Sequence, residues 1–211
     1  AALAELSPVA FIQHVLVRGL SAHAVVVGDD FRFGAGRAGD VTTLRALGVE
    51  YHFSVEAMDS VKVGGERVSS SLIRSALAAG ELQRAQRMLG RAYRLTSRVV
   101  YGDQRGREWG FPTANLPLFR AVSPLTGIFA VRVHGEDFQA EGVASVGYRP
   151  VFRLTQPLLE VFLLDFDRDI YGQRLSVDFL HKLREEADFN SVEQLITQIQ
   201  ADVVQARRYF S

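Results

Sequence analysis

The feature that most constrains the fold is a change of sequence pattern near residue 90. Before Gly90, helical patterns alternate with short apolar runs, which is typical of an α/β domain. From Tyr93 onward, the apolar residues fall in short alternating runs that Gly and Pro interrupt, as in an antiparallel barrel or sandwich. The 211 residues suffice for two small domains, each with a core. We therefore predict an α/β domain over residues 1–89 and a β domain over residues 90–211.

The expected ligand position in the first domain lies directly after an apolar strand. Residues 24–27 form an apolar run without alternation, which predicts a parallel strand that is covered on both faces. Ligands of parallel sheets bind beyond the carboxyl ends of the strands, so the loop of residues 28–40 is a candidate site. Other expected elements are a strand at 51–55 and helices at 1–20, 44–47, 69–79 and 81–89.

Three hydroxyl side chains open the helix that is expected at 69–79. Ser69, Ser70 and Ser71 can provide its N-cap, and this structural role is expected in any case. The same hydroxyls and the free backbone N–H groups also form a candidate anion site, which Arg74 would reinforce one turn further on.

In the second domain, strands are expected at 93–100, 127–133, 138–146, 158–166 and 175–179. The chain then ends in a helix that a capping box opens, with Ser191 followed three residues later by Gln194. The apolar stripe of this helix consists of Leu195, Ile199, Val203, Ala206 and Phe210.

Composition excludes several classes of function. The chain has no cysteine, which removes disulfides, thiolate nucleophiles and Cys-containing metal sites. Acidic and basic residues balance at 24 each, so we expect neither nucleic acid nor a membrane surface as a partner. The only lysines, Lys62 and Lys182, do not end a Gly-rich loop, so a Walker-type NTPase is excluded. No apolar run is long enough to span a bilayer, and we expect a cytoplasmic protein.

The segment of residues 102–115 is the most unusual in the second domain. Its glycines allow close approach of a ligand, and Arg105 and Arg107 could meet phosphate oxygens, although a solvated hairpin loop has a similar composition. Thr113 and Asn115 are two residues apart in an extended stretch, so their side chains face the same side. They offer two neutral oxygen ligands for Mg²⁺.

Glu160 occupies an odd position within the apolar run of residues 158–166. At a period of two it shares a strand face with Leu158 and Phe162, and the opposite face is also mostly apolar. A carboxylate at such a place is a candidate general base, and the alternative is a barrel-end glutamate paired with an arginine. By pattern alone, the run from Arg184 to Glu186 is a solvated charge cluster.

These motifs resemble a known family in order and spacing. Several segments of the second domain resemble the riboflavin kinase module. They are Gly102…Arg105-Gly106-Arg107…Gly110-Phe111-Pro112-Thr113-Ala114-Asn115, Gly127-Ile128-Phe129-Ala130, Gly147-Tyr148-Arg149-Pro150, Leu159-Glu160-Val161, Tyr171-Gly172 and Leu183-Arg184-Glu185-Glu186. Upstream, Val27-Gly28-Asp29-Asp30-Phe31-Arg32-Phe33-Gly34 and Val68-Ser69-Ser70-Ser71-Leu72-Ile73-Arg74 resemble the FMN adenylyltransferase module of bacterial bifunctional FAD synthetases.

The resemblance implies a six-stranded antiparallel barrel with a C-terminal helix that makes FMN and ADP from riboflavin and ATP. It implies that Thr113 and Asn115 coordinate Mg²⁺ with the ATP phosphates and that Glu160 is the catalytic base. It places Arg184 and Glu186 beside the flavin, which replaces their interpretation as a solvated run. The implied nucleotide-covering residues are Gly102, Arg105, Gly106 and Arg107.

For the first domain, the resemblance implies a partial Rossmann-like nucleotidyltransferase fold. The matching binding residues are Asp30, Phe31, Arg37, Ser70, Ser71 and Arg74. The family's His-x-Gly-His signature does not occur in these 211 residues, so we expect no FAD synthesis from them alone. The alternative function is a non-catalytic flavin- or nucleotide-binding module. The argument against this alternative is the joint presence of Thr113, Asn115 and Glu160. The sequence is compatible with a homo-oligomer.

Overall fold

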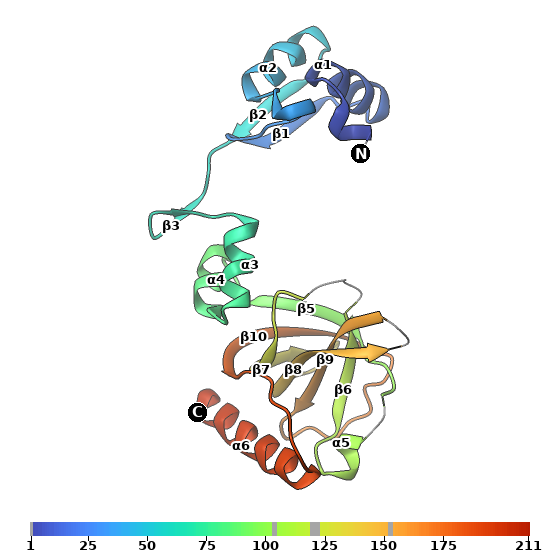
Figure 1. Ribbon diagram of the computed structural model, residues 1–211, viewed down its shortest axis with the longest axis vertical. Helices are drawn as coiled ribbons and strands as arrows, with labels where there is room; N and C mark the ends of the chain where they lie inside the picture. The colour runs from blue at the N-terminus through green and yellow to red at the C-terminus, as the bar shows by residue number, and fades with distance from the viewer. Residues whose placement is uncertain (1, 103–104, 119–122, 152–153) are drawn as a thin grey trace. The chain divides into compact units, whose positions relative to one another are not determined.

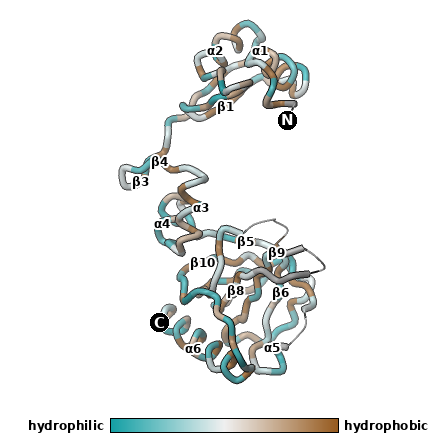
Figure 2. Tube along the Cα trace, in the orientation of Figure 1, coloured by the Kyte–Doolittle hydropathy of each residue, from teal (hydrophilic) through white to brown (hydrophobic). Residues whose placement is uncertain are grey.

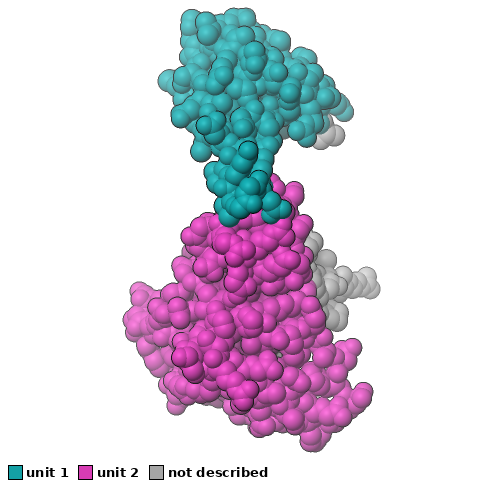
Figure 3. Space-filling model, turned by 90° about the vertical axis from the view of Figure 1, so that its left-hand side faces the viewer, with its two compact units in different colours: residues 1–68 teal, residues 69–211 magenta. Residues whose placement is uncertain are grey.

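The computed structural model describes residues 2–102, 105–118, 123–151 and 154–211 (Figure 1). The chain divides into two compact units, residues 1–68 and 69–211 (Figure 3). The first contains a small parallel sheet with helices, and the second contains a six-stranded antiparallel sheet with a C-terminal helix. The predicted fold class is confirmed.

Unit 1 is built on two parallel strands, β1 (Ala24–Gly28) and β2 (Ser54–Met58). Its core comprises Ile12, Phe33, Leu44 and Phe53. The helices are η1 (Ala2–Glu5), α1 (Pro8–Phe11), the π-type η2 (Ile12–Gly19), η3 (Ala35–Arg37) and α2 (Val41–Glu50), and the chain leaves through the hairpin β3 (Lys62–Val63) and β4 (Glu66–Arg67).

Three expectations for unit 1 differ in detail from the structure. The second strand begins at Ser54 rather than at Tyr51, because residues 51–52 form a turn in which His52 has a left-handed backbone with φ 61°. The first strand is not covered on both faces: Val25 and Val27 pack against the core, whereas Val26 is 56% exposed. The helix predicted at 44–47 extends over Val41–Glu50, since Asp40 caps it by accepting from the Thr43 backbone N–H at 2.8 Å.

Unit 2 contains a barrel whose strands follow the order β5-β10-β7-β8-β9-β6. The two outer strands meet where the Val100 N–H donates to the Asn115 carbonyl at 2.9 Å. The strands are β5 (Tyr93–Arg98), β6 (Thr113–Pro117), β7 (Gly127–His134), β8 (Gln139–Val151), β9 (Leu154–Leu163) and β10 (Arg174–Arg184).

The barrel core continues into two helices that precede it. Helices α3 (Ser70–Ala78) and α4 (Leu82–Leu89) contribute Leu77, Leu82 and Ala85 to the same buried cluster as Leu95 and Phe179. The compact units therefore divide at residues 68/69, ahead of the expected domain boundary at 89/90, because these apolar side chains are buried against the barrel. The domain assignment itself stays a prediction.

The C-terminal helix α6 (Val192–Phe210) covers part of the outer face of the barrel (Figure 1). Its Ala206, Val203 and Phe210 pack with Ile128 and Ala130 of β7. The predicted cap forms, since Ser191 Oγ accepts from the Gln194 N–H at 3.3 Å, and Gln194 Oε1 in turn accepts from the Asn190 N–H at 3.2 Å. Figure 2 shows the alternation of hydrophilic and hydrophobic residues along this amphipathic helix.

Candidate active site

Four polar side chains of the site come from one row of the barrel. Asn115 of β6 pairs with Glu160 of β9, and Glu160 pairs with Ser145 of β8. Directly paired residues of antiparallel strands lie about 5 Å apart and project from the same face of the sheet. The row continues through Ile128 of β7 to Arg184 of β10. Sheet register thus brings together residues that lie far apart in the sequence.

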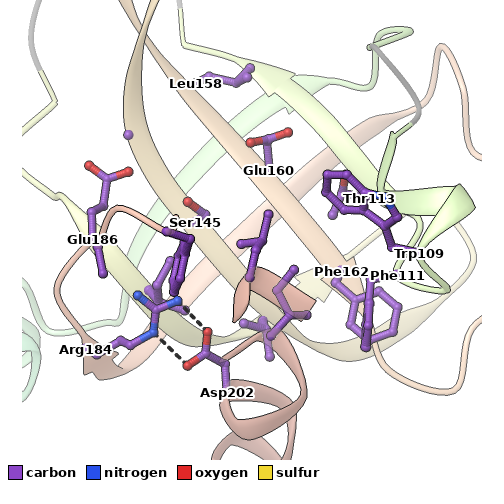
Figure 4. A pocket seen from close by; sticks show the side chains of 18 of the residues that line it. Trp109, Phe111, Thr113, Ser145, Leu158, Glu160, Phe162, Arg184, Glu186 and Asp202 are labelled. Atoms are coloured by element: carbon purple, nitrogen blue, oxygen red, sulfur yellow. Dashed lines mark hydrogen bonds and ion pairs between the residues drawn. The ribbon is translucent and has the colours of Figure 1, made fainter. Parts of the chain in front are cut away.

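Glu160 projects from the outer face of the barrel. Its neighbours Leu159 and Val161 are 1% and 0% exposed and belong to the interior cluster, and side chains alternate along a strand. Glu160 is half-buried and lines a cavity of about 490 Å³. It therefore lies away from a solvated face, which agrees with the prediction from the sequence. Figure 4 shows it between Thr113 on one side and Arg184 and Glu186 on the other.

Thr113 and Asn115 line the same cavity, as their spacing in the extended stretch predicted. The Asn115 side-chain amide donates to the Thr113 carbonyl at 3.4 Å. The Cα of Gly102 lies against this amide, and a Cβ there would be 2.6 Å from Asn115 Cγ. Gly102 therefore allows the backbone to cover Asn115, a close approach that a larger residue would prevent.

Arg184 reaches the cavity as half of a buried ion pair with Asp202 of α6. The Arg184 Nε donates to one carboxylate oxygen at 2.8 Å and Nη2 donates to the other at 2.7 Å (Figure 4). The Asp202 side chain is only 3% exposed, and it also accepts from the Gln198 amide at 2.9 Å. This bidentate geometry fixes the plane of the guanidinium and ties α6 to the cavity.

Glu186 lines the cavity from the segment that follows β10, where its carboxylate rests on the Cα of Gly147. Partial burial raises the pKa of Glu186 and the Asp188 carboxylate raises it further, which together outweigh the lowering effect of the Arg184 guanidinium. Because the residue as a whole is exposed, solvent limits this effect. Glu186 therefore places a carboxyl group that is protonated more readily than a free glutamate on the side of the cavity opposite Thr113.

The rest of the lining is apolar and aromatic. Phe111 meets Phe162 edge-on with ring centroids 5.4 Å apart, and Arg184 lies 5.8 Å from the ring of Phe189. A planar ligand fits such a lining, since aromatic faces and guanidinium planes stack on flat rings. The other apolar or aromatic lining side chains are Trp109, Ile128, Val143, Leu158, Ala187, Leu195 and Ile199.

The cavity confirms neither the roles of the predicted residues nor their ligands, but it shows which of them lie together. Six line it: Gly106, Thr113, Asn115, Glu160, Arg184 and Glu186. Gly102 packs on Asn115 instead, and Arg107 is exposed outside the lining. Gly106 and Arg107 lie in the short helix α5 (Arg105–Glu108), and the side chain of Arg105 falls outside the described residues.

Several lining residues were missed from the sequence. Asp202 had a readable signal, because it lies three residues after Ile199 and four before Ala206, on the apolar face of α6. Ser145 had none, since only non-local strand pairing brings it beside Glu160.

The residues predicted for nucleotide binding in the first domain fall into two groups. In unit 1, Asp30 pairs with Arg67 at 2.6 Å, Phe31 stacks on Phe33 and Arg37 is exposed. In unit 2, Ser70, Ser71 and Arg74 are exposed at the start of α3, where Ser69 Oγ caps the helix by accepting from the Leu72 N–H at 3.2 Å. The predicted cap is confirmed, and the binding roles stay predictions.

The described residues limit which metal sites are available. Within them, no group of three or more His, Cys, Asp or Glu side chains could hold a metal ion. No helix in the described part of the chain is long and apolar enough to cross a membrane.

Fold and cavity together define a barrel domain with a cavity on its outer face, joined to an α/β unit. The riboflavin kinase family model matches residues 89–210, and the FAD synthetase model matches residues 1–72. The chain belongs to the riboflavin kinase family.

Curated relatives extend this result. Bifunctional riboflavin kinase/FMN adenylyltransferases from Haemophilus influenzae, Escherichia coli K12 and Pseudomonas fluorescens are 43%, 44% and 46% identical over 95%, 95% and 97% of the chain. The chain spans 66%, 64% and 66% of their respective lengths. A crystal structure described as a macrolide-efflux protein from Streptococcus pneumoniae is 30% identical, with a TM-score of 0.76 over 98% of this chain and 67% of that one.

Proposed function

We propose that this protein is a riboflavin kinase, which transfers the γ-phosphate of ATP to the 5′-hydroxyl of riboflavin to give FMN and ADP. The observation that carries the proposal is the row of Asn115, Glu160 and Ser145 on the floor of the cavity, with Thr113 on the same strand as Asn115. A sensor of flavin would need the aromatic lining but not a carboxylate beside two neutral oxygen donors. Family membership supports the substrate class.

In this proposal Glu160 is the general base. Its carboxylate accepts the proton of the ribityl 5′-hydroxyl as that oxygen forms a bond to the γ-phosphorus. The bond from the γ-phosphorus to the β–γ bridging oxygen breaks, and ADP leaves with that oxygen. Glu160 suits this role because it lies on a rigid central strand that is hydrogen-bonded to neighbours on both sides, which fixes its position relative to Asn115.

The donors around Glu160 fit Mg²⁺. Thr113 and Asn115 supply neutral oxygens and Glu160 a single carboxylate, whereas Mg²⁺ in such sites is usually held by one or two carboxylates, substrate phosphates and water. Thr113 Oγ1 and the Asn115 side-chain carbonyl are the groups that would hold it. When bound, the ion would neutralise charge on the phosphates.

The two sides of the cavity suit the two substrates. The Gly102 and Gly106 backbone beside Thr113 and Asn115 suits a triphosphate, which approaches glycine closely. The opposite side, with Phe189, Arg184 and Glu186, suits the flat flavin ring and its polar edge. Under this arrangement the ribityl chain runs between the sides and presents its terminal hydroxyl to Glu160.

The direct test is to incubate the purified protein with Mg²⁺-ATP and riboflavin and follow FMN and ADP by chromatography. We expect equal amounts of both products. Protein that binds riboflavin with fluorescence quenching but forms no FMN would instead be a flavin-binding module. A parallel reaction with FMN and ATP, analysed for FAD, tests the expectation that these residues alone do not make FAD.

A further inference from the structure

The strand that delivers Arg184 to the cavity contains a bulge. Lys182 pairs with Phe129 of β7, yet Arg184 pairs with Ile128, the next residue of that strand, so Leu183 is an extra residue. In a regular strand Lys182 and Arg184 would project from the same face, because side chains alternate. The bulge directs Lys182 toward the interior side of the barrel with Phe129 and turns Arg184 to the outer face that carries Glu160.

Lys182 is packed unusually tightly for a lysine, and its side chain is only 14% exposed. Its stem lies against two glycines with left-handed backbones, Gly80 with φ 74° and Gly127 with φ 117°. A Cβ on Gly80 would be 2.6 Å from Lys182 Cδ, and one on Gly127 would be 3.1 Å from Lys182 Cε. The slender stem thus occupies a channel that the two glycines leave open.

The Lys182 ammonium group forms an ion pair with Glu185, on the C-terminal side of the bulge. Lys182 Nζ donates to Glu185 Oε1 at 2.6 Å and lies 6.0 Å from the centre of the Phe129 ring. The Arg184 Nη1 donates to the Glu185 carbonyl at 2.9 Å, so Glu185 is connected to both side chains. The backbone at Arg184 is also confined, since a Cβ on Gly127 would be 2.7 Å from the Arg184 carbonyl oxygen.

We propose that Lys182 is a positioning residue for the flavin side of the site. Its stem anchors the strand against Gly80 and Gly127, and its ion pair with Glu185 holds the bulge that turns Arg184 and Glu186 toward the cavity. Lys182 itself is not among the lining residues, so it acts through its neighbours. The inference rests on the proposed kinase function, because it assigns Arg184 and Glu186 to the flavin.

The test compares Lys182→Met and Glu185→Gln with Asp137→Asn. Methionine keeps an apolar stem in the channel but removes the ammonium, and Glu185 is 74% exposed, so its variant is expected to fold normally. Asp137→Asn removes a 2.7 Å ion pair with Arg168 away from the cavity lining and serves as the control. Riboflavin fluorescence gives the flavin dissociation constant without ATP, and initial rates give kcat and both KM values.

We expect Lys182→Met to weaken riboflavin binding and raise the KM for riboflavin about 10-fold, because small displacements of positioned groups have effects of this size. Glu185→Gln should change both in the same direction by about 2- to 3-fold, because solvent screens the exposed Glu185 carboxylate. The KM for ATP is expected to change by less than about 2-fold, and the Asp137→Asn values are expected to match the wild type. The double variant Lys182→Met/Glu185→Gln should be no weaker than Lys182→Met alone, since both substitutions break the same ion pair.

The inference is overturned if riboflavin binding is unchanged in both variants, or if both KM values rise equally while the midpoint of thermal unfolding falls, which would indicate a merely structural lysine. Failure of the kinase proposal looks different. In that case the wild type makes no FMN, whereas the comparison of flavin binding between Lys182→Met and wild type can still be made.

Discussion

The two units hold their candidate ligand groups by different means. In unit 1, the loop after β1 is stabilised by side chains: Ser60 Oγ donates to Asp29 at 2.7 Å and Arg67 pairs with Asp30 at 2.6 Å. In unit 2, Asn115, Glu160 and Ser145 are aligned by backbone pairing across three strands. Register in a closed barrel leaves little freedom to the side chains that share a row.

The two sheets also differ in how completely their side chains are buried. The β1–β2 sheet leaves Val26 56% exposed, whereas the barrel buries Leu159, Val161 and Phe129 to 1% or less. A side chain on a closed, packed scaffold is held more rigidly than one on a loop of a two-stranded sheet. We therefore expect the proposed kinase activity to depend on unit 2 alone, and the following substitutions test this.

The largest effect is expected from Glu160→Gln. Loss of the proton acceptor should lower the rate of FMN formation by about 10²–10⁴-fold, while riboflavin binding is kept because glutamine has the same shape. The matched change in unit 1, Arg67→Gln, breaks the pair with Asp30 and should leave FMN formation unchanged, since all lining residues of the cavity belong to unit 2. Equal loss of turnover in the two variants would contradict the separation.

The second prediction concerns packing. Leu159→Ala empties space in the barrel interior and should lower the free energy of unfolding by about 2–5 kcal/mol. Val26→Ala, on the exposed face of β1, should change it by no more than about 0.5 kcal/mol. Urea unfolding followed by circular dichroism measures both. A larger loss for Val26→Ala would mean that the exposed face of β1 is covered in solution.

Local pattern predicted one part of the candidate site, whereas Arg184 and Glu186 came only from the family resemblance, because pattern alone assigned them to a solvated cluster. The spacing of Thr113 and Asn115 places them on one face, and the apolar context of Glu160 indicates a half-buried carboxylate. Pattern could not predict that Ser145 and Asn115 flank Glu160, because strand register is a non-local property. Nor could it predict the bulge at Leu183, without which Arg184 would face the interior side.

The elements of unit 1 also show what local sequence pattern can and cannot predict. The sequence predicted a short helix at 44–47, but neither its cap at Asp40 nor its full length over Val41–Glu50, although helix caps are local features. Whether Val26 is covered depends on what packs on the sheet, and its apolar character alone suggested two covered faces. A high strand propensity indicates that a segment fits into a pleated sheet. It does not indicate whether one or both faces of that sheet are covered.

The third prediction concerns charge on the barrel surface. Burial alone would raise the pKa of Asp178, but hydrogen bonds from Arg94 and His134 outweigh this and lower the pKa of Asp178 from the ordinary value of an aspartate. A lowered carboxyl pKa adds stability that is present above the unfolded value and is lost as pH falls through the folded value. Asp178→Asn should therefore lower the free energy of unfolding by about 1–3 kcal/mol at pH 7, and the difference from wild type should shrink below about pH 4.

The counterpart in unit 1 is Asp30→Asn. Its pair with Arg67 is solvent-exposed, so the variant should show a smaller change in stability and a weaker dependence on pH. Urea titrations at pH 3 to 8 distinguish the two. A pH dependence of Asp178→Asn that equals the wild type would contradict the assigned ion pair.

The smallest effects are expected from two helix caps. Ser191→Ala removes the cap of α6, and Ser7→Ala removes that of α1, where Ser7 Oγ accepts from the Ala10 N–H at 3.2 Å. Each loss should cost about 1 kcal/mol, because one backbone N–H at the helix start is left without its acceptor. Only the α6 variant should also raise the KM for riboflavin, by about 2-fold, since α6 carries Asp202, which holds Arg184. A raised KM in Ser7→Ala would instead show that unit 1 contributes to the flavin site, and the separation between the two units would fail.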